Sequence, residues 1–213
     1  MIRAVLFDLD GTLHDRAETV RRYLKGHVAR FGLPEGYAER WAELDDLGYR
    51  PKEQVYAALV AGLQVSHPAE TLLADWYEYE KLEPQPMLGA RELLAGLRVQ
   101  GLKLGLVTNG RSEGQRATLG GLNLGAFDTV IISEEVGFGK PDPRIYALAL
   151  EQLRLPPEAV VFVGDSPEND VAGPQSVGMK AALLPGGHPL PAHIRPDWTL
   201  QDLRGVLALV NGL

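Results

Sequence analysis

The chain contains no cysteine among its 213 residues. The absence of thiols excludes disulfide scaffolds, thiolate metal sites and cysteine nucleophiles. Long hydrophobic runs are also missing, because nowhere do the roughly 18 consecutive apolar residues of a transmembrane helix occur. The first residues hold only a short apolar run with no small-residue cleavage site. We therefore expect a cytoplasmic protein without a membrane segment.

Basic charge is scarce as well. The 21 Lys and Arg residues are outnumbered by 28 Asp and Glu, which gives a net charge of −7 at pH 7. An acidic chain without a basic run is poorly suited to bind the phosphates of nucleic acids. We therefore expect no nucleic-acid partner. The protein is also expected to be an enzyme acting on a small molecule, as a monomer or a homodimer. With 45% hydrophobic residues, the chain can bury a core as one large domain with an insertion.

Short apolar runs alternate with amphipathic stretches along most of the chain. Strands are expected at Ala4–Phe7, Leu104–Val107, Val130–Ile132, Val160–Val163 and Ala181–Leu184. Helices are expected at Ala90–Arg98, Glu113–Leu122, Pro143–Leu153, Pro167–Val177 and Asp202–Val210. Apolar runs this short are typical of strands that are buried on both faces of a parallel sheet. The alternation predicts a doubly wound α/β fold.

The region from residue 15 to residue 86 departs from this alternation. It holds no strand-like run, and apolar residues such as Val20, Leu24 and Val28 recur at helical spacing. Prolines separate the helical segments. We therefore expect an α/β core at 1–14 and 87–213 and an inserted helical cap at 15–86. Both linkers of this cap flank the first strand, so we expect the cap to act as a lid and to govern substrate choice.

Polar residues follow the predicted strands, at the sheet edge where ligands bind in open α/β folds. These residues are Asp8 and Asp10 after the first strand, Thr108, Asn109 and Gly110 after the second, Lys140 beyond the third, and Asp165 and Asp170 after the fourth. Several carboxylates at one edge repel one another and need a cation to stay ionised. Oxygen ligands are those that Mg²⁺ prefers, so the pattern indicates a magnesium site.

Four of these segments identify a family. In order, Phe7–Leu13 (FDLDGTL), Thr108–Gly110, Lys140-Pro141 and Gly164–Asp170 (GDSPEND) resemble the four motifs of the haloacid dehalogenase-like (HAD) hydrolase superfamily. The helical insertion resembles the cap that one class of this family carries after its first motif. The dehalogenating branch characteristically lacks the second acid of the first motif. The presence of Asp10 therefore favours hydrolysis of phosphate esters.

The resemblance implies a role for each motif residue. Asp8 would be the nucleophile that forms an aspartyl-phosphate, and Asp10 would be the general acid and base. Thr108 would hydrogen-bond the phosphoryl group, and Lys140 would offset its charge. The implied Mg²⁺ ligands are Asp8, Asp10 (through its backbone carbonyl), Asp165 and Asp170. Further phosphate- or substrate-binding candidates are Asn109, Gly110, Arg111 and His14.

The expected substrate is a small phosphorylated metabolite of the phosphoglycolate, nucleotide or sugar phosphate class. Thr108–Gly110 with Gln115 shortly after them resembles the branch that holds nucleotidases and sialic-acid-phosphate phosphatases. Phosphoglycolate phosphatases share the same core. The sequence does not choose among these substrates.

Other functions are open at this stage. A phosphomutase or a dehalogenase of the same superfamily would share the core motifs. Gly110–Gly114 also matches the G-x-S-x-G pattern of a serine hydrolase, with Ser112 as nucleophile and with Asp165 and then His188 or His193 following it. A non-catalytic phospho-acceptor module combines clustered acids with a threonine and a lysine too.

One residue conflicts with the helix that is expected after the fourth motif. Pro174 lies inside the predicted Pro167–Val177 helix. A proline in a helix interior removes one hydrogen bond and clashes with the preceding turn. We therefore expect this helix to be kinked or broken, and the position of Asp170 depends on how.

Overall fold

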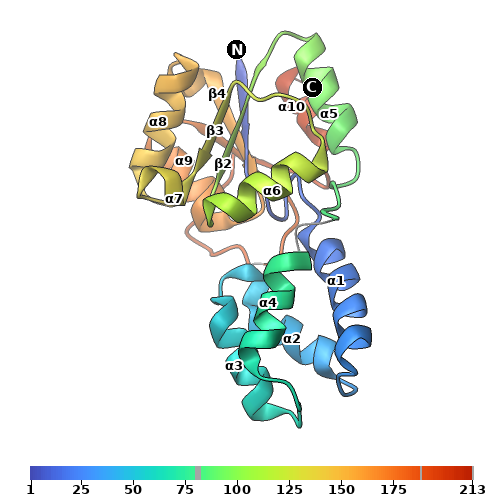
Figure 1. Cartoon of the computed structure of the whole chain (residues 1–213). Helices are drawn as coiled ribbons and strands as arrows, with labels where there is room; N and C mark the ends of the chain where they lie inside the picture. The colour runs from blue at the N-terminus through green and yellow to red at the C-terminus, as the bar shows by residue number, and fades with distance from the viewer. Residues whose placement is uncertain (80–82, 188, 213) are drawn as a thin grey trace. The chain divides into compact units, whose positions relative to one another are not determined.

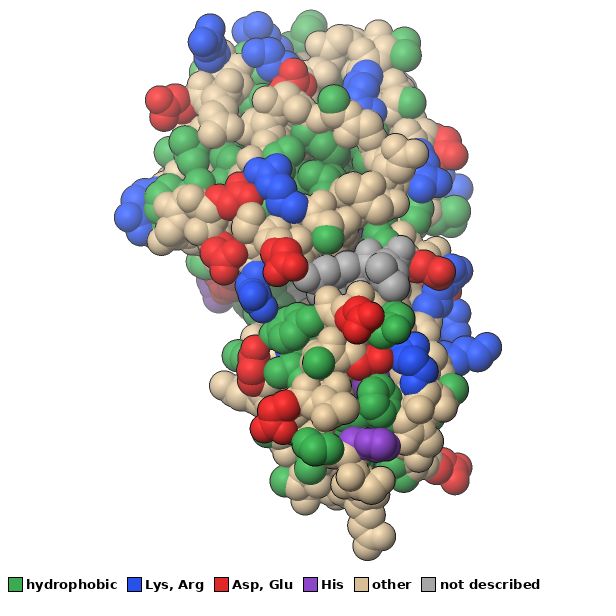
Figure 2. Space-filling view, in the orientation of Figure 1, with side chains coloured by type: hydrophobic (Ala, Val, Ile, Leu, Met, Phe, Trp, Pro, Cys, Tyr) green, Lys and Arg blue, Asp and Glu red, His purple; other side chains and the backbone are tan. Residues whose placement is uncertain are grey.

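A computed structural model describes the chain except for residues 80–82, 188 and 213. The chain divides into two compact units, one formed by Met1–Asp15 with Gln85–Leu213 and the other by Arg16–Pro84. Among the described residues, no helix combines the length and the apolar character needed to cross a bilayer. Acidic and basic side chains are interspersed on the visible surface (Figure 2).

The first unit is built on a six-stranded sheet in the order β3-β2-β1-β4-β5-β6. The strands are β1 (Ala4–Phe7), β2 (Lys103–Thr108), β3 (Thr129–Ile132), β4 (Val160–Gly164), β5 (Lys180–Leu183) and β6 (Trp198–Thr199). All neighbouring strands pair in parallel. The order extends in both directions from β1, so the prediction of a doubly wound α/β fold is confirmed. Strand β6, only two residues long, was not predicted.

Helices cover both faces of this sheet (Figure 1). They are α5 (Ala90–Val99), α6 (Ser112–Leu122), α7 (Ser133–Val136), α8 (Pro143–Leu153), α9 (Gly173–Ser176) and α10 (Gly205–Val210). Alternate residues of β1 point to opposite faces, so Val5 and Phe7 pack with α5, α6 and α10, while Leu6 packs with α8. Helix α10 begins at Gly205, three residues later than predicted, and the single turn α7 was not predicted.

The helix after β4 changes its type just before Pro174. Pro167–Ala172 (η3) forms a π-helix, and the α-helical hydrogen-bonding pattern resumes only at α9. The amide of Gly173 donates to the carbonyl of Glu168, five residues back. Pro174 is therefore the second residue of α9 and lies in the first turn of this helix, where proline is tolerated. The expected break is present as a change of helix type.

The second unit is helical and has its own core. Its helices are α1 (Arg16–Phe31), α2 (Tyr37–Asp45), α3 (Lys52–Gly62) and α4 (Ala69–Tyr79). A 3₁₀ turn (η1) follows α2 at Asp46–Gly48. Trp41 and Trp76 are buried together with ring centroids 4.8 Å apart. The buried Asp75 carboxylate accepts hydrogen bonds from Arg30 at 2.6 Å and interacts with His27 at 2.7 Å, so its charge is compensated inside this unit.

The two segments at which the insertion begins and ends lie side by side within the first unit. His14 forms an antiparallel bridge with Pro86. The amide of Asp15 donates to the carbonyl of Gln85 at 2.8 Å, and the amide of Met87 donates to the carbonyl of Leu13 at 2.8 Å. The chain therefore leaves the α/β unit shortly after β1 and returns to it at Gln85, beside the segment from which it left.

Candidate active site

Strands β1 and β4 are neighbours that end at the same edge of the sheet. The residues that directly follow the two strands therefore lie close to each other. Phe7 pairs with Val163 in the parallel register, and the amide of Asp8 donates to the carbonyl of Val163 at 3.0 Å. Asp8 follows β1 directly, and Asp165 follows β4 directly. One carboxylate oxygen each from Asp8, Asp165 and Asp170 lies within 4.8 Å of the others. The edge of the sheet thus carries a compact group of three acids.

Asp170 enters this group from the π-helix. Its side chain is fully buried, and one carboxylate oxygen accepts a hydrogen bond from the amide of Ser166 at 2.9 Å. A side chain at position 164 would collide with it, since a Cβ there would lie 2.3 Å from the Asp170 carboxyl carbon. The π-helix therefore sets the position of Asp170, and Gly164 leaves the space that its side chain occupies. The sequence alone did not determine this position.

Lys140 is the cation that neutralises part of this charge. Its Nζ lies 2.8 Å from Asp8 Oδ1 and 2.7 Å from Asp170 Oδ1. The side-chain amide of Asn109 holds the backbone of Lys140, accepting from its N–H at 2.7 Å and donating to its carbonyl at 2.8 Å. The Asn109 side chain thus holds Lys140 in place, and binding of phosphate by Asn109 remains a prediction.

The charges of this group are not balanced. Burial raises the pKa of Asp8 to about 8 against the lowering effect of Lys140, and nearby Asp170 and Asp165 add to the rise. Burial and then Asp170 raise the pKa of Asp165 to about 6. Asp170 and Asp8 raise the pKa of Lys140 above its ordinary value despite its burial, so the amine stays charged. When all three carboxyls are ionised, they and one ammonium leave two negative charges uncompensated; a divalent cation would balance that charge and favour the ionised form.

The surroundings of Asp165 also fit a metal ligand. A Cβ at Gly11 would lie 2.4 Å from Asp165 Oδ2, and a Cβ at Gly186 would lie 2.9 Å from the same oxygen. Gly11 has φ +79, a conformation that other residues rarely adopt. These two glycines leave room around the carboxylate that side chains would otherwise fill. Oxygen ligands from Asp8, Asp165 and Asp170 thus match the preference of Mg²⁺.

Asp10 lies beside this group and has its own partners. Its Oδ1 is 2.6 Å from His14 Nδ1, and its Oδ2 accepts a hydrogen bond from Gln115 Nε2 at 3.0 Å. His14 was predicted to contact substrate, yet its side chain is buried and engaged with Asp10. Contact between His14 and a substrate remains a prediction.

Thr108 lies at the end of β2 and is almost fully buried. Its hydroxyl oxygen accepts a hydrogen bond from Gln115 Nε2 at 2.8 Å. Gly110 donates its backbone N–H to Ser133 at 3.0 Å, while Arg111 is exposed just before α6. In the sequence, Gln115 indicated only a resemblance to one branch of the family, and it was not predicted to lie in the site.

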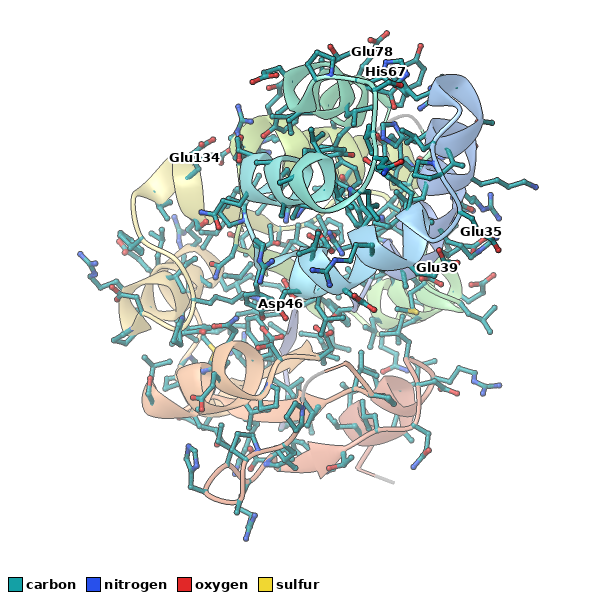
Figure 3. The ribbon with its side chains drawn as sticks, turned by 90° about the horizontal axis from the view of Figure 1, so that it is seen from below. Glu35, Glu39, Asp46, His67, Glu78 and Glu134 are labelled. Atoms are coloured by element: carbon teal, nitrogen blue, oxygen red, sulfur yellow. The ribbon has the colours of Figure 1, made fainter. Side chains whose placement is uncertain are left out.

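The serine hydrolase arrangement does not form among the described residues. The Ser112 hydroxyl donates to Glu135 at 2.5 Å, and its amide donates to Glu134 at 2.7 Å. Glu134, labelled in Figure 3, belongs to α7. His193 lies 3.5 Å from Glu168 instead of beside Ser112. His188, the other candidate base, lies outside the described residues.

Comparison with known proteins agrees with the four motifs. The family model described as haloacid dehalogenase-like hydrolase matches residues 2–178. The chain belongs to this family. The prediction of the family is thereby confirmed. The predicted enzyme class, an HAD-type phosphatase, is confirmed by curated relatives that are named as phosphatases.

Individual relatives of this HAD hydrolase carry different names. Over 184 residues it is 39% identical to the Escherichia coli pyrimidine 5'-nucleotidase YjjG, covering 85% of this chain and 72% of that protein. Over 119 residues it is 42% identical to a phosphoserine phosphatase of Thermus thermophilus, a match spanning 55% of this chain and about half, 48%, of that relative. The Bacillus subtilis HAD hydrolase YfnB, whose crystal structure is magnesium-bound, superposes with a TM-score of 0.81 at 23% identity over 99% of both chains.

Proposed function

We propose that this HAD hydrolase cleaves a small phosphate monoester in two steps, with Asp8 as nucleophile and Mg²⁺ as cofactor. The observation that carries the proposal is the group formed by Asp8, Asp165 and Asp170, with the Nζ of Lys140 between Asp8 and Asp170. Its excess negative charge and its oxygen ligands suit a divalent cation. A phosphoryl group, which also carries negative charge, would need that cation and Lys140 together.

In the first step, an Asp8 oxygen attacks the phosphorus of the substrate. The P–O bond to the leaving group breaks as the bond between phosphorus and Asp8 forms, which gives an aspartyl-phosphate. Asp10 donates a proton to the departing alkoxide oxygen. Lys140 stays 2.8 Å from Asp8 Oδ1, where it offsets the charge that gathers on the transferring group. Thr108 offers its hydroxyl to a phosphoryl oxygen.

In the second step, water replaces the leaving group. Asp10, now a carboxylate, accepts a proton from that water as its oxygen attacks the phosphorus. The bond between phosphorus and Asp8 breaks, so inorganic phosphate leaves and Asp8 returns to its starting form. The residue that acted as acid therefore acts as base, and no net proton is stored on the enzyme.

Mg²⁺, when bound, supplies charge stabilisation for the phosphoryl oxygens and favours the ionised form of the nucleophile. Asp8, Asp165 and Asp170 would hold it with their carboxylates, and the family resemblance adds the backbone carbonyl of Asp10. Because the pKa of Asp165 is raised to about 6 and that of Asp8 to about 8, protons compete with the cation at these oxygens.

Removal of the metal tests this proposal. We expect an excess of chelator to abolish hydrolysis of p-nitrophenyl phosphate and added Mg²⁺ to restore it. Ca²⁺ should restore less activity because its coordination shell is larger and looser. Release of p-nitrophenolate measures the rate. Undiminished turnover in excess chelator would contradict the assignment of the acid group as a metal site.

Substitution of the proposed acid and base tests the proton transfers. We expect Asp10→Asn to reduce kcat by roughly 10²-fold or more, because proton transfer by a positioned side chain contributes about that much. The amide keeps the size of the side chain and an oxygen for its neighbours. Steady-state rates with an alkyl phosphate measure the effect. A variant as active as the parent would exclude Asp10 from both steps.

The physiological substrate is a separate question. Two of the relatives named above carry names for different phosphate esters, phosphoserine and pyrimidine 5'-nucleotides. We propose that the helical unit at Arg16–Pro84 selects the substrate. A panel of phosphorylated acids, nucleotides and sugars would rank the candidates. Assay of free phosphate beside the organic product separates hydrolysis from phosphomutase activity, since a mutase returns the phosphoryl group to a sugar.

A further inference from the structure

Gln115 is a buried polar residue beside Asp10 that has no part in the proposed mechanism. It lies on α6, and its side-chain NH2 group, which carries two hydrogens, is within hydrogen-bonding distance of three oxygens: Asp10 Oδ2 at 3.0 Å, Thr108 Oγ1 at 2.8 Å and the Asn109 carbonyl at 2.9 Å. A carboxylate and a carbonyl only accept hydrogen bonds, so the nitrogen of the amide must face them. One side chain thus joins the proposed acid and base to the proposed phosphate-binding loop.

The local sequence is built around this side chain. A Cβ at Gly110 would lie 3.1 Å from Gln115 Cγ and 3.2 Å from its Nε2, so a larger residue at that position would press on the amide. Gly110 also has φ +144, which lets the loop turn toward α6. The glycine of the Thr-Asn-Gly segment therefore makes room for Gln115.

The Asp10 carboxylate is held from two sides. His14 engages Oδ1 at 2.6 Å, and Gln115 engages Oδ2 at 3.0 Å. His14 comes from the segment that follows β1, and Gln115 comes from the helix that follows β2. Two contacts on different oxygens fix both the position and the rotation of a carboxylate, whereas one contact leaves rotation free.

We infer that Gln115 is a positioning residue that orients Asp10 for proton transfer and, through the same amide, fixes the Thr108 hydroxyl. The inference rests on the proposed two-step function. The Gln115 nitrogen donates to the Thr108 oxygen, so the Thr108 hydroxyl acts as a donor toward another partner. In the structure it donates to the Asn109 carbonyl at 3.4 Å, a long contact that a phosphoryl oxygen would replace. Loss of the amide would remove the contact that Gln115 makes with Asp10 Oδ2.

The decisive experiment replaces Gln115 by methionine, which keeps the length of the side chain and removes the donor. With p-nitrophenyl phosphate, whose leaving group needs no proton, we expect kcat to fall roughly 10²-fold and kcat/KM to fall far less. Phosphorylated Asp8 should accumulate in the steady state because attack by water still requires Asp10. With an alkyl phosphate, kcat/KM should fall as well.

Two further variants complete the test. Gln115→Glu has nearly the same shape but places a carboxylate against three oxygen acceptors, so its defect should exceed that of methionine. Arg116→Met is the control, since Arg116 lies on the same helix and pairs with Glu135 at 2.7 Å on the surface. It should keep the parent kinetics.

The outcomes are distinguishable. Equal losses of kcat and kcat/KM with both substrates would show that Gln115 only supports the fold. No loss in either Gln115 variant would show that its contacts do not matter for catalysis. Either result would overturn the inference. A parent enzyme that shows no magnesium-dependent turnover and no phosphorylated Asp8 would instead overturn the proposed function.

Discussion

Replacement of Asp8 by asparagine is expected to reduce turnover by roughly 10⁴-fold or more, because removal of an enzyme nucleophile typically costs several orders of magnitude. An amide cannot attack phosphorus in place of a carboxylate. The amide oxygen can still accept the hydrogen bond from Lys140 Nζ, which lies 2.8 Å from Asp8 Oδ1. The comparison is made with p-nitrophenyl phosphate at saturating Mg²⁺.

The Asp8→Asn variant should remain folded. Because burial raises the pKa of Asp8 to about 8, its ionised form is less favourable in the folded chain than in the unfolded chain. A raised carboxyl pKa means that the ionised group lowers the free energy of unfolding near neutral pH, and a neutral amide removes that effect. Thermal melting of the variant beside Asp202→Asn, an exposed control paired with Arg204, measures this. Parent-like activity in Asp8→Asn would contradict the role of Asp8.

Replacement of Lys140 by methionine should cost both activity and stability. Lys140 is buried between Asp8 and Asp170, so its loss leaves two carboxylates facing each other without their cation. Removal of one partner from a buried ion pair costs about 3–5 kcal/mol of the free energy of unfolding. We expect turnover to fall by several orders of magnitude as well, because the transferring phosphoryl group loses the same charge.

The pH dependence of Lys140→Met gives an independent check. Since the pKa of Asp8 is already raised to about 8, protonation of the acids favours the folded state, and the stability of the variant should rise as the pH falls below that value. Added Mg²⁺ should restore stability too. Lys180→Met is the matched control: Lys180 pairs with Asp197 at 2.8 Å, half exposed, and its loss should cost less than about 1 kcal/mol. Equal melting temperatures for the parent and Lys140→Met would contradict this account.

The sheet and the approach of the acids could be predicted because both follow from short-range rules. Continuous apolar runs indicate buried parallel strands, and residues directly after such strands must lie at one edge. Asp8 and Asp165 are such residues, since their strands β1 and β4 are neighbours in register. Strand β6 escaped prediction because two residues carry no usable pattern.

The remaining features of the site depend on contacts between distant residues. Asp170 reaches Lys140 through a π-helix, whose five-residue spacing no propensity rule indicates. Asn109 looks like a phosphate-binding residue in sequence, yet its side chain bonds to the backbone of a residue 31 positions away. Gln115 contacts Asp10 across 105 positions. A sequence pattern cannot indicate such partners, and the roles of all these residues in catalysis stay predictions.

Capture of the covalent intermediate tests the central claim most directly. The enzyme is mixed with Mg²⁺ and a phosphate monoester, quenched in acid within the first turnovers, digested and analysed by mass spectrometry. We predict a single phosphorylated peptide, with the added mass on Asp8, and no such peptide from Asp8→Asn. A phosphoryl group on Ser112 or on any other residue would contradict the account. So would turnover by Asp10→Asn without a detectable adduct, because this variant should hydrolyse the aspartyl-phosphate slowly.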